Sequence, residues 1–243
     1  MGKYFNVTVK PTITASLQAG GTIATGDIAF DWTSFDIPKG ASKLTGLTIL
    51  LRGTNGARQE KGIDFYFAKT VGGVAPGSLG TISATANGSK YQNHLIGAST
   101  IQTGDYKDGL DIMSVASSGH GAGANQVPGV VLEGEPTTGT HVGVDKLYLG
   151  AIAVGALDFR STVQCDGIQA ITQDVLTVKT TSALTNFAVG DVLHDENDRA
   201  MGTVLTVDGA TQMTMAANLA NATVNNKDLY NINPITVIMS FER

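Results

Sequence analysis

Several residue types are scarce in this chain of 243 residues, and each shortage excludes a class of structure. The one cysteine, Cys165, excludes an intrachain disulfide and a zinc site made of several cysteines, and we expect it to be a small, partly buried residue. No apolar run approaches the roughly 18 residues of a transmembrane helix, so no membrane span is expected. The opening stretch MGKYFNVTVK lacks the apolar centre of a signal peptide. These shortages indicate a protein made in a reducing cytoplasm.

Charge is also scarce, and positive charge is the scarcer of the two. Charged residues make up 15 % of the chain, against about 25 % in typical soluble domains. The formal net charge is −5, and no stretch carries the cluster of lysines and arginines that nucleic-acid binders show. We therefore expect no nucleic-acid partner. A surface with so few charges also favours a protein whose neighbours in an assembly cover much of it.

Glycine and β-branched residues, by contrast, are abundant. Glycine fills 30 of the 243 positions, about 12 % against an average near 7 %. Long runs with the 3.6-residue period of a helix are missing, whereas alternating or continuous apolar runs recur, so the chain is predicted to be all-β. The predicted strands are residues 4–9, 28–32, 34–37, 44–52, 63–67, 146–157, 174–179, 189–193, 201–207, 212–215, 229–232 and 235–241. Residues 13–17 are predicted to be extended, and the nearly continuous apolar run at 44–52 is predicted to be buried on both faces. Shorter elements are predicted at 110–115 and 130–132.

The pattern divides the chain into two domains. Residues 1–172 with 233–243 are predicted to form a jelly-roll-like β-sandwich, with long Gly-rich loops over 70–141. Residues 173–232 hold short strands and are predicted to form a small SH3-like β-barrel module, inserted before the last strand of the main sheet. Within it, Asp208-Gly209 predicts a type I′ hairpin turn, because both residues tolerate a positive φ.

One stretch of the module concentrates polar side chains that could hold a metal ion. Residues 194–198, HDEND, contain a histidine and three carboxylates. A calcium loop that began at Asp195 would need a glycine and a glutamate where Ala200 and Thr206 stand. His194 and Asp195 are adjacent, so on a strand they would point to opposite faces. The stretch is therefore interpreted as the solvated tip of a hairpin.

The remaining candidates for chemistry are isolated residues. None of His94, His120, His141 and His194 is paired at a metal-binding spacing. Ser118-Gly119-His120 lacks the G-x-S-x-G of a nucleophile elbow, and residues 87–90, NGSK, lack the spacing of a phosphate loop.

Acidic and aromatic residues leave two alternatives open. Asp105, Asp108 and Asp111 are interpreted as a solvated loop, although two distant carboxylates could still form a glycosidase pair. Trp32 shares an alternating face with Phe30, and the core is favoured over a carbohydrate site. No residue is therefore predicted to be catalytic, cofactor-binding or metal-binding, and the chain is predicted not to be an enzyme.

Two stretches of the chain carry a resemblance. Residues 35–40, FDIPKG, are followed by LTGLTILLRGTNG and IDFYFAKT. This series of stretches resembles the sequences of minor virion proteins of tailed bacteriophages, of the marine T4-like type that infects cyanobacteria. The module, VGDVLHDENDRAMGTVLTVDGATQMTM followed later by NKDLY, is similar to a small β-barrel unit in structural proteins of the same phages.

The resemblance implies a non-enzymatic structural protein of the virion, made in the bacterial cytoplasm of the host. Capsid decoration is favoured, with the major capsid protein or other virion proteins as partners and with self-association, a trimer first. The alternative is a tail, neck or fibre component that binds a receptor or glycan. No cofactor, nucleic-acid partner or membrane partner is expected.

Overall fold

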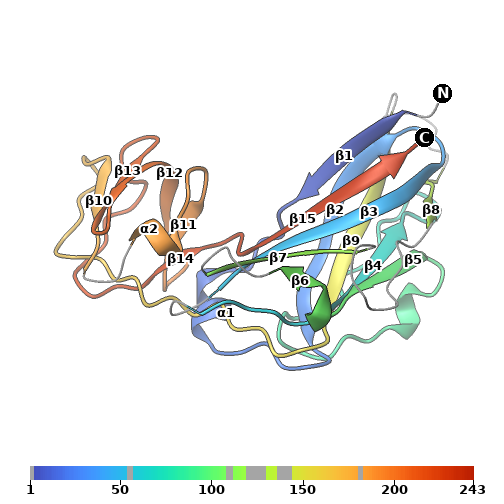
Figure 1. The fold of residues 1–243 in the computed structure, drawn as a ribbon, viewed down its shortest axis with the longest axis horizontal. Helices are drawn as coiled ribbons and strands as arrows, with labels where there is room; N and C mark the ends of the chain where they lie inside the picture. The colour runs from blue at the N-terminus through green and yellow to red at the C-terminus, as the bar shows by residue number, and fades with distance from the viewer. Residues whose placement is uncertain (1–2, 54–56, 108–111, 119–129, 136–143, 180–182) are drawn as a thin grey trace.

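The computed structural model describes residues 3–53, 57–107, 112–118, 130–135, 144–179 and 183–243. These residues are mostly β, as the composition predicts, and they form three antiparallel sheets (Figure 1). In sheet order, the first sheet contains β1 (Tyr4–Val9), β15 (Ile235–Glu242), β3 (Ser42–Arg52), β7 (Met113–Ser117) and β6 (Tyr106–Lys107), with β8 (Val131–Leu132) beside β3. The second contains β2 (Ile28–Pro38), β9 (Val144–Ala153), β4 (Ile63–Lys69) and β5 (Leu95–Ile101).

The third sheet belongs to the later part of the chain. Its strands, in order, are β10 (Val175–Thr177), β13 (Gln212–Met215), β12 (Ala200–Gly209), β11 (Val192–Asp195) and β14 (Leu229–Asn231). Two short α-helices, α1 (Ala15–Ala19) and α2 (Ala183–Asn186), and two 3-10 helices, η1 (Ser89–Tyr91) and η2 (Thr103–Asp105), complete the described elements. We call residues 163–232 the module, which adds ten residues to the predicted 173–232 because Val163 and Cys165 pack in its core. The rest of the described chain is the body.

The first two sheets share one hydrophobic core. Alternation along each strand sends every second side chain into that core, so β15 contributes Val237 and Met239 while β4 contributes Phe65 and Phe67. The two aromatic rings of Phe30 and Phe65 lie 6.3 Å apart within it. β15 lies between β1 and β3, so the last strand of the sequence pairs on both sides within the first sheet.

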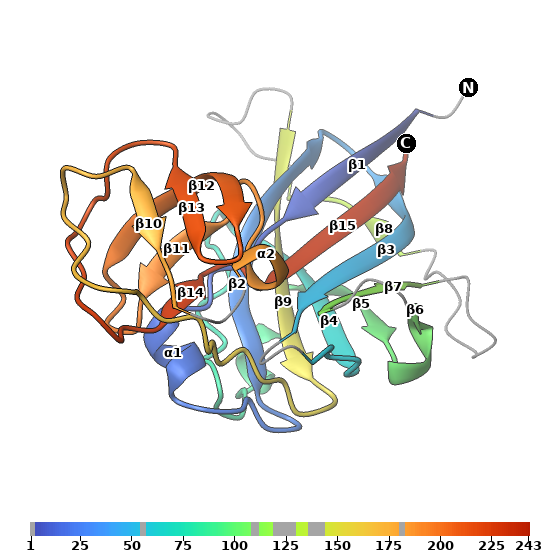
Figure 2. The same cartoon turned by 60° about the vertical axis from the view of Figure 1, so that its left-hand side comes forward.

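The module has a separate core. The buried side chains that form it are Val163, Cys165, Leu176, Val178, Ala183, Phe187, Leu193, Met201, Val204, Met213, Met215, Leu219 and Leu229. The chain passes from one core to the other between Phe159 and Val163. In both views the module stands to one side of the body, and the chain returns from it through β14 and β15 (Figures 1 and 2).

The two outer strands of the module's sheet are bonded to one segment, residues 163–166. The Leu229 N–H donates to the Val163 carbonyl at 2.8 Å, beside β14, and the Lys179 N–H donates to the Gln164 carbonyl at 2.9 Å, beside β10. Segment 163–166 makes only isolated bridges, so the described residues contain no closed barrel of strands.

Three local features of the structure differ from the prediction. Residues 13–17 are predicted to be extended, yet α1 begins at Ala15, since Ala, Leu and Gln favour a helix and five residues show no period. The apolar stretch at 44–52 is predicted to be buried on both faces, but β3 alternates between buried and partly covered positions. Within region 70–141, β7 and β8 lie at the short elements predicted at 110–115 and 130–132, whereas β5 and β6 are not predicted.

The predicted Asp208-Gly209 turn is also wrong. β12 continues through Gly209, which pairs with Gln212, so the turn residues are Ala210 and Thr211. The Asp208 carboxylate accepts hydrogen bonds at 2.7 Å from the hydroxyls of Thr206 and Thr214. The bond from Thr206 lies within β12 and the bond from Thr214 comes from β13, so together they hold Asp208 within a bulged strand pair instead of a turn.

Candidate functional site

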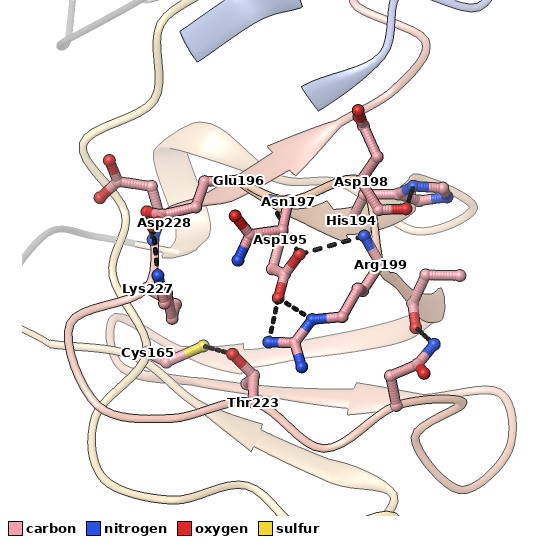
Figure 3. A network of polar contacts seen from close by, with 12 residues as sticks. Cys165, His194, Asp195, Glu196, Asn197, Asp198, Arg199, Thr223, Lys227 and Asp228 are labelled. Atoms are coloured by element: carbon pink, nitrogen blue, oxygen red, sulfur yellow. Dashed lines mark hydrogen bonds and ion pairs between the residues drawn. The ribbon is translucent and has the colours of Figure 1, made fainter. Parts of the chain in front are cut away.

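The polar run at 194–198 is the most densely bonded part of the module (Figure 3). The Asp195 carboxylate is fully buried and accepts hydrogen bonds from the Asn197 N–H and the Arg199 N–H, both at 3.0 Å. The Arg199 guanidinium lies 2.6 Å from the same carboxylate. The predicted hairpin is confirmed, because the run joins β11 to β12, but its tip is not solvated throughout: Asp195 is buried and satisfies the backbone donors of the tight turn from inside.

The other members of the run point to separate partners. The His194 Nδ1 donates to the Asp198 carbonyl at 2.9 Å. Asp198, at a positive φ of 62°, accepts a hydrogen bond at 3.0 Å from the Ser16 N–H of α1. Glu196 pairs with the Lys227 ammonium. The carboxylates are thus divided between the turn, the body and the segment that leads into β14.

These bonds shift the acidity of the two partly exposed carboxyls in the same direction. Burial alone would raise the pKa of Asp198, but the hydrogen bonds from the Ser16 side chain and from the N–H groups of Ser16 and Ala15 outweigh it and lower this pKa. The hydrogen bond from Lys227 lowers the pKa of Glu196. Both side chains are therefore carboxylates in neutral solution.

A second set of contacts joins the module to the body beside the first. Arg52 at the end of β3 donates to the Asn186 carbonyl and lies 2.7 Å from the Asp191 carboxylate. Gln18 of α1 donates to the Asn231 carbonyl of β14 at 2.9 Å. Burial raises the pKa of Asp191 even though the Arg52 charge opposes the shift. The junction thus pairs α1 and β3 of the body with three loops or strands of the module.

The other predicted candidates lie apart from one another. The His94 Nδ1 donates to the Lys69 carbonyl at 2.9 Å, and the Ser118 hydroxyl accepts from the Leu47 N–H at 3.1 Å. Asp105 is buried and accepts from the Gln102 N–H at 2.8 Å, so it caps η2 instead of facing solvent. The candidates His120, His141, Asp108 and Asp111 lie outside the described residues.

Residues 87–90 and Cys165 have structural surroundings. Ser89 donates to the Asn87 side chain at 3.2 Å, and the Lys90 ammonium lies 5.0 Å from the centre of the Tyr91 ring. Burial raises the pKa of the Cys165 thiol to about 11, and its sulfur lies 4.0 Å from the Thr223 hydroxyl. Within the described ranges, no group of three or more His, Cys, Asp and Glu side chains is arranged to hold a metal ion. In the same ranges, no helix is long and apolar enough to cross a membrane.

Trp32 lies on the outer face of the second sheet and lines a hollow there. Two bulges in β2 place Phe30 in the body's core but turn Trp32 to the other face, so the prediction that they share a face is wrong. Trp32 packs edge-on against Tyr91, with ring centres 5.7 Å apart. Together with Tyr66, Leu79 and other mostly apolar neighbours, they line a hollow of about 280 Å³.

The module also exposes large apolar side chains that sequence reasoning did not single out. Ile168 is 76 % exposed and Val224 is 49 % exposed. The bridge between Gln169 and Thr223 buries those two side chains and sets Ile168 beside Val224 on the outside. Ile171, 56 % exposed, follows on the same segment. Two isoleucines in the polar stretch CDGIQAITQD were the available signal.

Comparison with known proteins adds no family. No protein-family model matches the sequence, and no curated protein matches it. Among solved structures, a chain in the structure of infectious bursal disease virus Gx strain is similar at 10 % identity and a TM-score of 0.15. The alignment covers 100 % of this chain and 42 % of the viral chain, so this chain spans less than half the length of the viral chain. A TM-score of this size carries no argument about fold or function.

Proposed function

We propose that this chain is a non-enzymatic structural protein of a tailed-bacteriophage virion, which decorates and stabilises the capsid through contacts with the major capsid protein. In this proposal the body is a jelly-roll-like β-sandwich and the module is a small SH3-like barrel whose last gap is filled by segment 163–166. The packing of Val163 and Cys165 with the module supports a module that starts near residue 163.

The apolar outer surface of the module is the observation that carries the proposal. Five large side chains there are about half exposed or more: Ile168, Ile171, Val189, Leu205 and Val224. Ile168 and Val224 lie side by side across the Gln169–Thr223 bridge, and contiguous apolar surface on a soluble protein usually marks a site that a partner covers. The module projects from the body, so it could reach a neighbouring subunit while the body lies on the shell (Figure 1).

Quantitative mass spectrometry of purified virions tests this assignment. The phage that carries the gene is grown and its particles are purified, and the chain is counted against the major capsid protein. We expect a fixed ratio that fits the capsid lattice. A ratio of only a few copies per particle would move the chain to the neck or tail, and its absence from particles would overturn the proposal.

A receptor- or glycan-binding role on a tail or fibre is the second candidate, and the hollow at Trp32 favours it. Aromatic rings with partly exposed faces stack on sugar rings, and the partly buried Trp32 and Tyr66 come together there beside the buried Tyr91. In this case Trp32→Ala would abolish binding on a glycan array and reduce adsorption of the phage to its host. Normal adsorption with Trp32→Ala and an empty array would overturn it.

A further inference from the structure

The free edges of the body's two sheets are not equally protected against pairing with another chain. β2 carries two bulges and the charged residues Asp31 and Asp36, β5 pairs through a register shift, and β6 has only two residues. Bulges, charges and short length are the features by which proteins block exposed sheet edges. β1 has none of them: its six residues pair with β15 without a register shift, and no charged residue lies within Tyr4–Val9.

The backbone of β1 directs half of its hydrogen-bonding groups away from the sheet. Lys3 and Arg243 exchange both backbone hydrogen bonds, at 3.4 and 3.0 Å. Bonding alternates along an antiparallel pair, so Phe5, Val7 and Val9 also bond toward β15. The N–H and C=O groups of Tyr4, Asn6 and Thr8 therefore point outward, and in the described chain no strand pairs with them.

The side chains of β1 leave apolar surface uncovered at the same edge. Phe5 stacks on Phe241 of β15 with ring centres 5.2 Å apart, but Phe5 and Val7 are only partly buried. Tyr4, on the opposite face of the sheet, is 74 % exposed. Figure 1 shows β1 along the rim of the body with β15 beside it. Another strand on the open side would cover Phe5 and Val7 and extend the core.

We propose that the occupant of this edge is β1 of a second copy, paired antiparallel about a twofold axis at Asn6. The outward groups then meet: Asn6 faces Asn6 of the second copy, and Tyr4 faces its Thr8. The same register sets Phe5 opposite Val7 on the core face, so apolar side chains meet apolar ones. Lys3 falls opposite Val9, and no two like charges lie opposite each other in the paired strands.

This self-pairing is independent of the virion assignment, because it is a property of the isolated chain. A twofold strand pair uses the same surface on both copies and closes as a dimer. It therefore differs from the trimer that the phage resemblance favours, and oligomeric state separates the two.

The experiment measures the association of the purified full-length chain by sedimentation velocity over a series of concentrations. Asn6→Lys sets two lysines opposite each other at the axis, and Asn6→Pro removes an outward N–H without removing a bond to β15. We expect a dimer for the unchanged chain and an association at least about tenfold weaker for both variants, which corresponds to roughly 1.4 kcal/mol. Ser34→Lys, an exposed position on β2, is the matched control and should leave the dimer intact.

A second measurement uses only the unchanged chain, so it does not depend on the folding of the variants. In the unchanged chain, dimer formation should slow hydrogen exchange at the N–H groups of Asn6 and Thr8, which are free in the monomer. A monomer at all concentrations, an oligomer that both Asn6 variants leave intact, or fast exchange at Asn6 and Thr8 in the oligomer would each overturn the proposal. Loss of the dimer with Ser34→Lys alone would overturn it in favour of β2.

Discussion

The body and the module are stabilised in different ways, although both are β. The body pairs strands of up to 11 residues and fills its core with phenylalanine, leucine and isoleucine from two facing sheets. Apart from β12, the module's strands have three or four residues, and its core consists mainly of leucine, valine and methionine, with one phenylalanine and no isoleucine. Short strands make few ladder hydrogen bonds, so buried polar side chains satisfy the rest.

Three buried polar side chains of the module show this most clearly. Asp195 accepts from the backbone of its own turn, while Gln169 donates to the Asp166 carbonyl at 2.5 Å and to the Thr177 hydroxyl at 2.8 Å. Thr223 is fully buried beside Cys165. In the body, buried polar side chains such as Gln18, Gln59 and Asp105 satisfy backbone groups in helices and loops, whereas hydrogen-bond ladders satisfy its long strands. The comparison therefore teaches that polar side chains complete the backbone bonding where strands are short, which is the case in most of the module.

The largest expected effect is a truncation in the body's core. Phe65→Ala removes a fully buried ring, which costs about 3–5 kcal/mol of unfolding free energy. Because the cores are separate, hydrogen exchange should quicken in β4 and β9 while β12 and β13 keep their protection. Met213→Ala in the module is the matched control, with about 2–5 kcal/mol and the opposite pattern. Equal acceleration in both halves would show a single cooperative unit and break the comparison.

The next effect concerns polar satisfaction in the module. Asp195→Ala leaves the N–H groups of Asn197 and Arg199 without their acceptor, at about 1–3 kcal/mol for each buried group left unpaired. Asp195→Asn keeps one carbonyl oxygen for those donors and should lose less. Chemical denaturation of the three proteins measures this order. If Asp195→Ala is as stable as Asp195→Asn, apolar packing alone holds the module and the distinction fails.

Alternation could predict the body's strands because most of them run straight across one core. Residues 4–9, 63–67 and 235–241 appear in the structure as β1, β4 and β15, since their apolar side chains need only a period of two. Trp32 was placed on the wrong face because bulges shift the period and leave no mark in composition. β5 was missed because its glycine and serine weaken the apolar pattern.

The module's candidate site was harder to predict, because its partners lie far away in the chain. The acidic run 194–198 shows its composition directly, but the contact of Asp198 with Ser16 spans a sequence separation of 182. Likewise, Ile168 and Val224 meet only through a bridge between distant segments. Local spacing could reject a calcium loop, yet it could not distinguish a solvated turn from one that faces the body.

A smaller effect should appear at the junction as the pH falls. The pKa of Asp198 lies below its ordinary value of 3.8, so its contribution is present above that pH and is lost as the pH falls through the lowered pKa. An NMR titration of the Ser16 amide should therefore show a midpoint below 3.8, and Asp198→Asn should remove it. Asp208→Asn is the control, because the hydroxyls of Thr214 and Thr206 lower the pKa of Asp208 within the module alone. A midpoint at or above 3.8 would contradict the contact.

Substitutions on the module's apolar outer surface should have the smallest effect on stability. They test whether this surface of the module, unlike its core, serves binding. Ile168 and Val224 contact solvent in the isolated chain, so Ile168→Ser with Val224→Ser should change the unfolding free energy by no more than about 0.5 kcal/mol per site. If a partner covers this surface, the same double variant should lose binding to purified capsids that lack the chain, measured by co-sedimentation. The matched variant Val74→Ser removes an exposed apolar side chain from the body and should keep capsid binding. Undiminished binding by the double variant would mean that the surface is bare in the particle, and that the module's exposed isoleucines and valines serve no contact.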